Sequence, residues 1–117
     1  MNIESVREYC LSKKGATEEF PFDDETLVFK VVGKMFACMP LEKADLLILK
    51  CDADYAIELR DAHSAIEPAW HFNKKYWNQH RCSELSEELL IHLIDHSYDE
   101  VIKKMTRKQR AMIENLE

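Results

Sequence analysis

The chain has 117 residues, of which 46% are hydrophobic and 32% are charged, and its formal net charge is −6. This composition is typical of one globular domain, which we expect to span residues 1–117, and it excludes a disordered chain. No apolar run approaches the roughly 18 residues of a membrane helix, and the N-terminus lacks the basic and apolar regions of a signal peptide, so we expect a cytoplasmic protein without a membrane partner.

The first predicted element is a helix that Asn2 caps and that ends at Gly15. A short acidic connection, ATEEFPFDDE, follows it. The segments TLVFKVV and MFACM then flank Gly33-Lys34, which predicts a type II′ hairpin in which Val32 pairs with Met35. In this register one apolar face meets the helices, and it consists of Leu27, Phe29, Val31, Phe36 and Cys38. The opposite, mixed face consists of Val28, Lys30, Val32, Met35 and Ala37.

The second half of the chain predicts three more strands and four more helices. Residues 45–51, 65–69 and 76–82 have the composition of strands, and residues 54–61 form a short helix capped by Asp52. Ser86 precedes a helix, and the capping-box patterns Ser97-x-x-Glu100 and Thr106-x-x-Gln109 predict two further helix starts. The predicted order is α-β-β-β-α-β-β-α-α-α. This order indicates a single compact α+β domain with an antiparallel sheet of about five strands and with N-terminal and C-terminal helices.

The sequence contains no recognisable set of catalytic residues. It lacks G-x-S-x-G and phosphate-loop patterns, and HLIDH lacks the glutamate of H-E-x-x-H, so we interpret His92 and His96 as surface residues. The four cysteines form no C-x-x-C pair, which favours buried thiols over a metal site. We therefore expect no enzymatic activity, no cofactor and no metal.

Residues 66–82, IEPAWHFNKKYWNQHRC, concentrate aromatic, basic and amide side chains. On a strand, Trp77 and Arg81 lie on the same side, where they can stack on bases and contact phosphate. The alternative is that Trp70 and Trp77 are core residues and that the neighbouring lysines are solvated turn charges. Against a basic interface, the chain as a whole has no strong basic footprint.

Five segments occur in the order EEFPF, TLVFKVVGKMFA, LLILKC, IEPAWHFNKKYWN and SYDEVIKKM. Together they resemble the MmcQ/YjbR family of small bacterial proteins over residues 17–110. The sequence HFNK at residues 71–74 departs mildly from the His-Met-Asn-Lys of that family. The resemblance implies a double-wing fold related to secretion-chaperone-like architectures, a DNA-binding role and no catalytic set.

We therefore expect a non-enzymatic DNA-binding protein that contacts mainly backbone phosphate, so that binding is weak and depends on salt. The candidate contact residues are Lys30, Lys34, Lys50, His71, Asn73, Lys74, Lys75, Trp77 and Arg81. The alternative is a protein- or peptide-binding adaptor without nucleic-acid affinity, which contacts its partner through exposed tryptophans. A small-molecule enzyme is the third hypothesis, and it requires a deep pocket around His71, Asn73 and Trp77.

Overall fold

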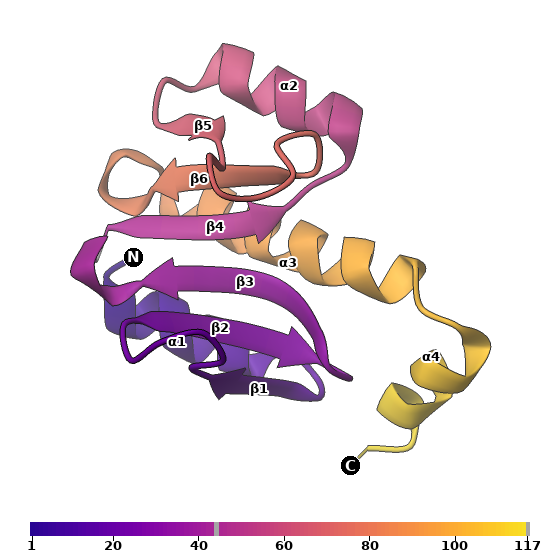
Figure 1. Cartoon of the computed structure of the whole chain (residues 1–117). Coiled ribbons are helices and arrows are strands. Elements are labelled where there is room, and N and C mark those ends of the chain that lie inside the picture. Colours follow the sequence, from indigo (N-terminus) through magenta and orange to yellow (C-terminus); the bar gives the residue numbers. More distant parts are fainter. Residues whose placement is uncertain (44, 117) are drawn as a thin grey trace.

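The computed structural model describes residues 1–43 and 45–116, and within these residues the chain forms one antiparallel sheet of six strands in the order β1-β2-β3-β4-β6-β5. The strands are β1 (Ala16–Glu19), β2 (Thr26–Val31), β3 (Lys34–Pro40), β4 (Leu46–Lys50), β5 (Ile66–Pro68) and β6 (Trp77–Arg81). The helices are α1 (Ile3–Ser12), α2 (Ala53–Ala62), α3 (Glu87–Lys103) and α4 (Arg107–Glu114). The predicted α+β class is confirmed (Figure 1).

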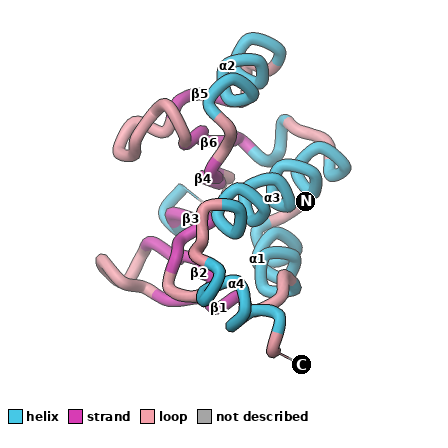
Figure 2. Tube along the Cα trace, turned by 90° about the vertical axis from the view of Figure 1, so that its right-hand side faces the viewer, coloured by secondary structure: helices cyan, strands magenta, loops and turns pink. Residues whose placement is uncertain are grey.

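The two faces of the sheet are covered differently. Helices α1 and α3 lie on one side of it, and the loop between β5 and β6 projects on the other (Figure 2). The main core lies under the helices and includes Val6, Phe29, Phe36 and Ile94. We call the other side the open face. Its smaller apolar cluster consists of Val28, Cys38, Ile48 and Ala69, with Met35, Phe72 and Trp77 packed against it.

Helix starts were predicted well where a polar cap precedes an apolar run. The Asn2 side chain accepts the Ser5 N–H at 2.8 Å, and Asp52 accepts the Tyr55 N–H at 3.1 Å. The capping box of Thr106 and Gln109 is also present and opens α4. Each of these side chains satisfies a backbone N–H that has no partner inside its helix.

The acidic connection after the first helix was predicted incorrectly. Residues Ala16–Glu19 form β1, which pairs with β2, so the sheet has six strands instead of about five among the residues that the structure describes. In β1, the partly buried Ala16 and Glu18 alternate with the exposed Thr17 and Glu19. An edge strand tolerates this polar composition because charged side chains protect its free edge against further pairing.

The hairpin loop is Val32-Gly33, so the predicted loop Gly33-Lys34 was wrong by one residue. Val31 pairs with Lys34. Both loop residues have positive φ, 48° at Val32 and 72° at Gly33, as in a type I′ turn. This turn follows the right-handed twist of the strands better than most two-residue loops do.

A register shift in β3 places Ala37 and Cys38 on the faces opposite to those predicted. The pairing changes between Phe29 and Lys30, which leaves Phe36 as the extra residue of a β-bulge. Phe29 therefore pairs with Ala37, and both belong to the main core. Cys38 belongs to the open-face cluster, where it was not expected.

Val32 is a β-branched residue with positive φ, which is a strained conformation. We expect Val32→Asn to raise the free energy of unfolding by about 1 kcal/mol, because Asn-Gly is the preferred type I′ pair. Urea denaturation measures the change. Val32→Ala is the control, since it loses packing and keeps the strain, and it should lower stability. Equal losses in both variants would show that packing outweighs the backbone conformation.

Ser97 does not begin a helix, contrary to the prediction, because α3 runs without a break from Glu87 to Lys103. The buried Ser97 hydroxyl accepts the Lys50 N–H at 2.8 Å and donates to the Phe36 carbonyl at 2.5 Å. Strands β3 and β4 pair only at Ala37–Leu49 and Cys38–Ile48, so Phe36 and Lys50 would form the next pair. The hydroxyl thus takes the place of a direct backbone hydrogen bond and holds the two strand ends apart.

Candidate functional site

A hollow of about 270 Å³ lies where β3, β4 and β6 meet the C-terminal end of α3. We call it the basic hollow, because three of its seven lining residues are lysines. The lining residues are Lys34, Met35, Lys50, Trp77, Val101, Lys104 and Met105. Lys34 begins β3, Lys50 ends β4, and Lys104 follows α3 directly. Ser97 contributes to this geometry, because it binds the backbone of Lys50 beside the hollow.

The positive charges of the lysines in the basic hollow repel one another. Partial burial lowers the pKa of Lys50 below its usual value, and the ammonium groups of Lys104 and Lys34 lower it further. Glu100 opposes this effect, but its carboxylate also lies 3.4 Å from the ammonium nitrogen of Lys103. Positive charges that converge in this way are stabilised when an anion binds between them.

Two aromatic rings lie beside these ammonium groups. The Lys50 nitrogen is 6.0 Å from the centre of the Trp77 ring, and the Lys104 nitrogen is 4.5 Å from the centre of the Tyr76 ring. Lys75 lies 5.4 Å from the same Tyr76 ring, so it extends the basic surface beyond the hollow. Trp77 is half-buried and packs against Phe72 with 5.3 Å between ring centres. Trp77 is therefore partly a packed residue and partly a surface aromatic residue beside a lysine, the two alternatives that the sequence left open.

Arg81 and Lys30 lie outside the basic hollow, and acidic partners compensate their charges. The Arg81 guanidinium donates to Glu84 at 2.5 Å and to Glu67 at 3.1 Å. Lys30 forms an ion pair with Glu19 of the neighbouring edge strand. The structure thus separates these two cations from Lys34 and Lys50, although the sequence grouped them together.

The remaining candidates lie in the loop between β5 and β6. The Asn73 side chain accepts the Lys75 N–H at 3.1 Å and its carbonyl accepts the Tyr76 N–H at 3.0 Å, so Asn73 shapes the turn. The Lys74 ammonium lies 4.5 Å from the centre of the Trp70 ring. His71 points toward a second hollow on the open face.

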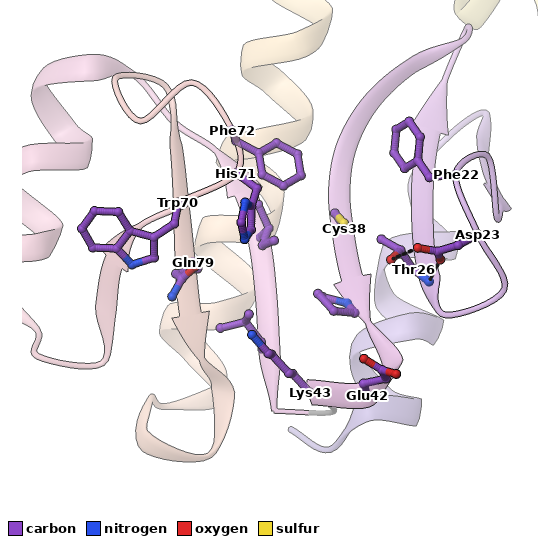
Figure 3. Close-up of a pocket in the computed structure, with 13 residues that line it drawn as sticks. Phe22, Asp23, Thr26, Cys38, Glu42, Lys43, Trp70, His71, Phe72 and Gln79 are labelled. Carbon is purple, nitrogen blue, oxygen red and sulfur yellow. Dashed lines mark hydrogen bonds between the residues drawn. The ribbon is translucent and has the colours of Figure 1, made fainter.

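This second hollow, which we call the open-face groove, has a volume of about 500 Å³ and lies at the opposite ends of β3 and β4. Trp70 and Phe22 stand on opposite sides of it, and Glu42 and Lys43 lie at one end (Figure 3). Its lining residues are Phe22, Asp23, Thr26, Cys38, Pro40, Glu42, Lys43, Leu46, Ile48, Trp70, His71, Phe72 and Gln79. Asn73 and Trp77 are not among them, so this groove differs from the deep pocket that the enzyme hypothesis required.

Sequence reasoning missed Lys104, which completes the basic hollow. The signal for it was the pair Lys103-Lys104 near the end of a helical pattern, where cations favour the helix dipole. That signal predicts a position at the end of a helix, but it does not predict which strand ends lie beside it. The contact follows from the packing of α3 against β3 and β4.

The cysteines have the properties of buried thiols, as expected. All four are free and buried. Burial raises the pKa of Cys10 and Cys51 to about 12 and that of Cys38 and Cys82 to about 11. At neutral pH these thiols are therefore protonated, and a protonated thiol is a poor nucleophile.

The chain is thus a small α+β protein with an open antiparallel sheet and a lysine-rich surface at one end of its central strands. The YjbR family model matches residues 11–100, and the chain belongs to the YjbR family. The family resemblance seen in the sequence is confirmed. Within the described residues, no helix has both the length and the apolar character required to cross a membrane.

Three relatives illustrate the extent of the similarity. The uncharacterized protein YjbR of Escherichia coli K12 is 27% identical over 118 residues, which cover 99% of this chain and all of that protein. A Deinococcus radiodurans crystal structure with a DUF419 domain is 37% identical, with a TM-score of 0.89 over 96% of this chain and 87% of that one. A Pseudomonas syringae protein shares the fold at 23% identity, with a TM-score of 0.72 over 86% of this chain and 98% of that one.

Proposed function

We propose that this protein is a non-enzymatic nucleic-acid-binding domain that contacts DNA mainly through backbone phosphate. The observation that carries the proposal is the convergence of Lys34, Lys50 and Lys104 on one hollow whose other lining residues are apolar. Partial burial and the neighbouring ammonium groups lower the pKa of Lys50, and a phosphate between the three lysines would relieve the part that comes from their repulsion. Lys75 and Tyr76 lie beside the hollow and can add a phosphate contact and a stacking surface.

The proposed binding is weak and has little sequence preference. Lysine contacts to phosphate do not distinguish one base from another, so they give no sequence preference. The net charge of −6 opposes the approach of DNA and weakens binding. We expect dissociation constants of about 10⁻⁶ to 10⁻⁴ M at moderate salt, the range of non-specific binding. The protonated state of the four thiols disfavours cysteine as a nucleophile. The cytoplasmic location and the double-wing description remain predictions.

The triple variant Lys34→Gln/Lys50→Gln/Lys104→Gln should lose most of the affinity for a mixed-sequence DNA duplex. Each lysine that no longer neutralises a phosphate should reduce the slope of log K against log salt by about one. Fluorescence anisotropy from about 50 mM to 200 mM salt measures both quantities. No binding of the wild-type protein at the lowest salt would contradict the proposal.

A second triple variant, Lys14→Gln/Lys43→Gln/Lys108→Gln, is the matched control. It removes the same charge from three exposed lysines that do not line the basic hollow. We expect its salt slope to stay close to the wild-type value. An equal loss of affinity in both triple variants would show that total charge governs binding, and that the basic hollow has no particular role.

The alternative function, a protein- or peptide-binding adaptor, is supported by a different part of the surface. The Trp70 side chain is 56% exposed and lines the open-face groove, and tryptophan is enriched at the energetic centres of protein interfaces. The two functions use opposite ends of β3 and β4, so one does not exclude the other.

A further inference from the structure

The open-face groove exposes large apolar side chains that a folded domain usually buries. Phe22 is 71% exposed and Trp70 is 56% exposed, and both stand at the edge of the groove. Ile48 and Cys38 lie at the base of the groove in the open-face cluster. The volume of about 500 Å³ lies within the roughly 300–1,000 Å³ that is typical of ligand sites. Such a surface gains free energy when an apolar side chain covers it.

The charge around the groove is predominantly negative on the Phe22 side. Asp23 and Glu42 line the groove, and the exposed Asp24 and Glu25 lie in the same loop as Asp23. Hydrogen bonding to Glu42 raises the pKa of Glu25, which indicates that the two carboxyl groups lie close together. When both carboxyl groups are ionised they repel each other, and a cation placed between them would relieve this repulsion.

The Asp23 carboxylate is held in a fixed position. It accepts the N–H groups of Glu25 at 2.8 Å and Thr26 at 2.7 Å, and these hydrogen bonds lower its pKa. The negative charge beside Phe22 therefore remains at neutral pH. On the lining itself, Lys43 is the positive group that partly offsets this charge.

We propose that the open-face groove binds a peptide segment of a partner protein, with an apolar side chain of that segment between Phe22 and Trp70. A lysine or arginine next to it in the segment meets the carboxylates of Asp23 and Glu42. The negative charge on the Phe22 side of the groove matches this cationic residue and disfavours a phosphate backbone there. The proposal goes beyond nucleic-acid binding, because it uses a different site and a different partner.

The test is an array of immobilised heptapeptides of randomised sequence, probed with the labelled full-length chain. We expect the retained peptides to be enriched in lysine or arginine beside leucine, phenylalanine or tryptophan. Trp70→Ser should weaken their binding by at least about tenfold, because tryptophan contacts are frequent hot spots. Absence of enrichment, or enrichment of acidic peptides, would overturn the proposal.

Variants of the charged groove residues Glu42 and Lys43 test the charge contact separately from the apolar contact at Trp70. Glu42→Gln should weaken a selected peptide about two- to fivefold at low salt, and Lys43→Gln should strengthen it. The matched control is Ile57→Ser, which removes an apolar side chain that is 51% exposed on α2. It should leave peptide binding unchanged. An equal effect of Ile57→Ser and Trp70→Ser would overturn the proposal.

Two further outcomes identify a different occupant and also overturn the proposal. The first is a concentration-dependent dimer in sedimentation that Trp70→Ser abolishes, which would make a second copy of the chain the occupant. The second is a loss of DNA affinity in Trp70→Ser, which would assign the groove to nucleic acid. The lysine triple variant at the basic hollow should retain peptide binding, so failure at one site is distinguishable from failure at the other.

Discussion

Ser97→Ala should lower the free energy of unfolding by about 2–4 kcal/mol, since each buried polar group that loses its partner costs about 1–3 kcal/mol. The variant leaves the Phe36 carbonyl and the Lys50 N–H facing each other across the separated ends of β3 and β4. Guanidinium denaturation at neutral pH measures the loss. Ser97→Cys should fall between wild type and alanine, because a thiol is a weak donor and acceptor.

A surface hydroxyl provides the control for Ser97. Ser12→Ala removes an exposed hydroxyl that donates to the Tyr9 carbonyl at 2.6 Å, and it should change stability by less than about 0.5 kcal/mol. Hydrogen exchange gives a local readout, because the Lys50 amide should exchange much faster in Ser97→Ala. A small loss of stability together with slow exchange would contradict the prediction. It would show that Lys50 and Phe36 form the direct hydrogen bond once the hydroxyl is absent.

Ser97 also shows why part of the fold could not be predicted from the sequence. The pattern Ser97-x-x-Glu100 has the residues of a capping box, but in the fold the hydroxyl faces Phe36 and Lys50, more than forty residues away in sequence. Local sequence patterns predict hydrogen bonds between residues that lie within a few positions of each other. They cannot distinguish a serine that caps a helix from one that satisfies a distant strand.

The strand of residues 77–81 illustrates what the sequence predicts well. Alternation placed Trp77, Gln79 and Arg81 on one side, and the structure leaves these three half-buried while Asn78 and His80 are fully buried. A period of two is a property of the backbone itself, so it holds whatever the neighbouring strands are. Which side chains lie next to a strand depends on residues far away in the sequence. The predicted interface therefore included Arg81 with the lysines, although Arg81 donates to Glu67 and Glu84 in the structure.

The arrangement of charge follows from the directions of two central strands. Lys34 begins β3 and Lys50 ends β4, so antiparallel pairing brings both lysines to one end of the sheet. Pro40 and Leu46 occupy the other ends of the same strands and line the open-face groove. An acidic chain can therefore have a lysine-rich hollow at one end of these strands and a groove with acidic and aromatic side chains at the other. Net charge alone describes neither surface.

The pH dependence of stability should be dominated by His80 between about pH 6.5 and pH 4. The imidazole is 2% exposed, and burial lowers its pKa from 6.5 to about 4, against the opposing effect of the hydrogen bond to the Leu47 carbonyl at 2.9 Å. The unfolded chain therefore binds a proton at higher pH than the folded chain does. The His80 contribution is complete above pH 6.5 and is lost as the pH falls to about 4, with a total loss of about 3 kcal/mol.

His80→Asn tests this assignment, because its amide can donate to the Leu47 carbonyl and does not titrate. Urea denaturation at a series of pH values should give a nearly flat profile for this variant between about pH 6.5 and pH 4, where wild type loses stability. Asp95 and Glu18 have lowered pKa values, so their contribution is lost at more acidic pH and remains in both proteins. His71→Asn, at an exposed position, should reproduce the wild-type profile. Superimposable profiles for His80→Asn and wild type would show that other groups cause the loss.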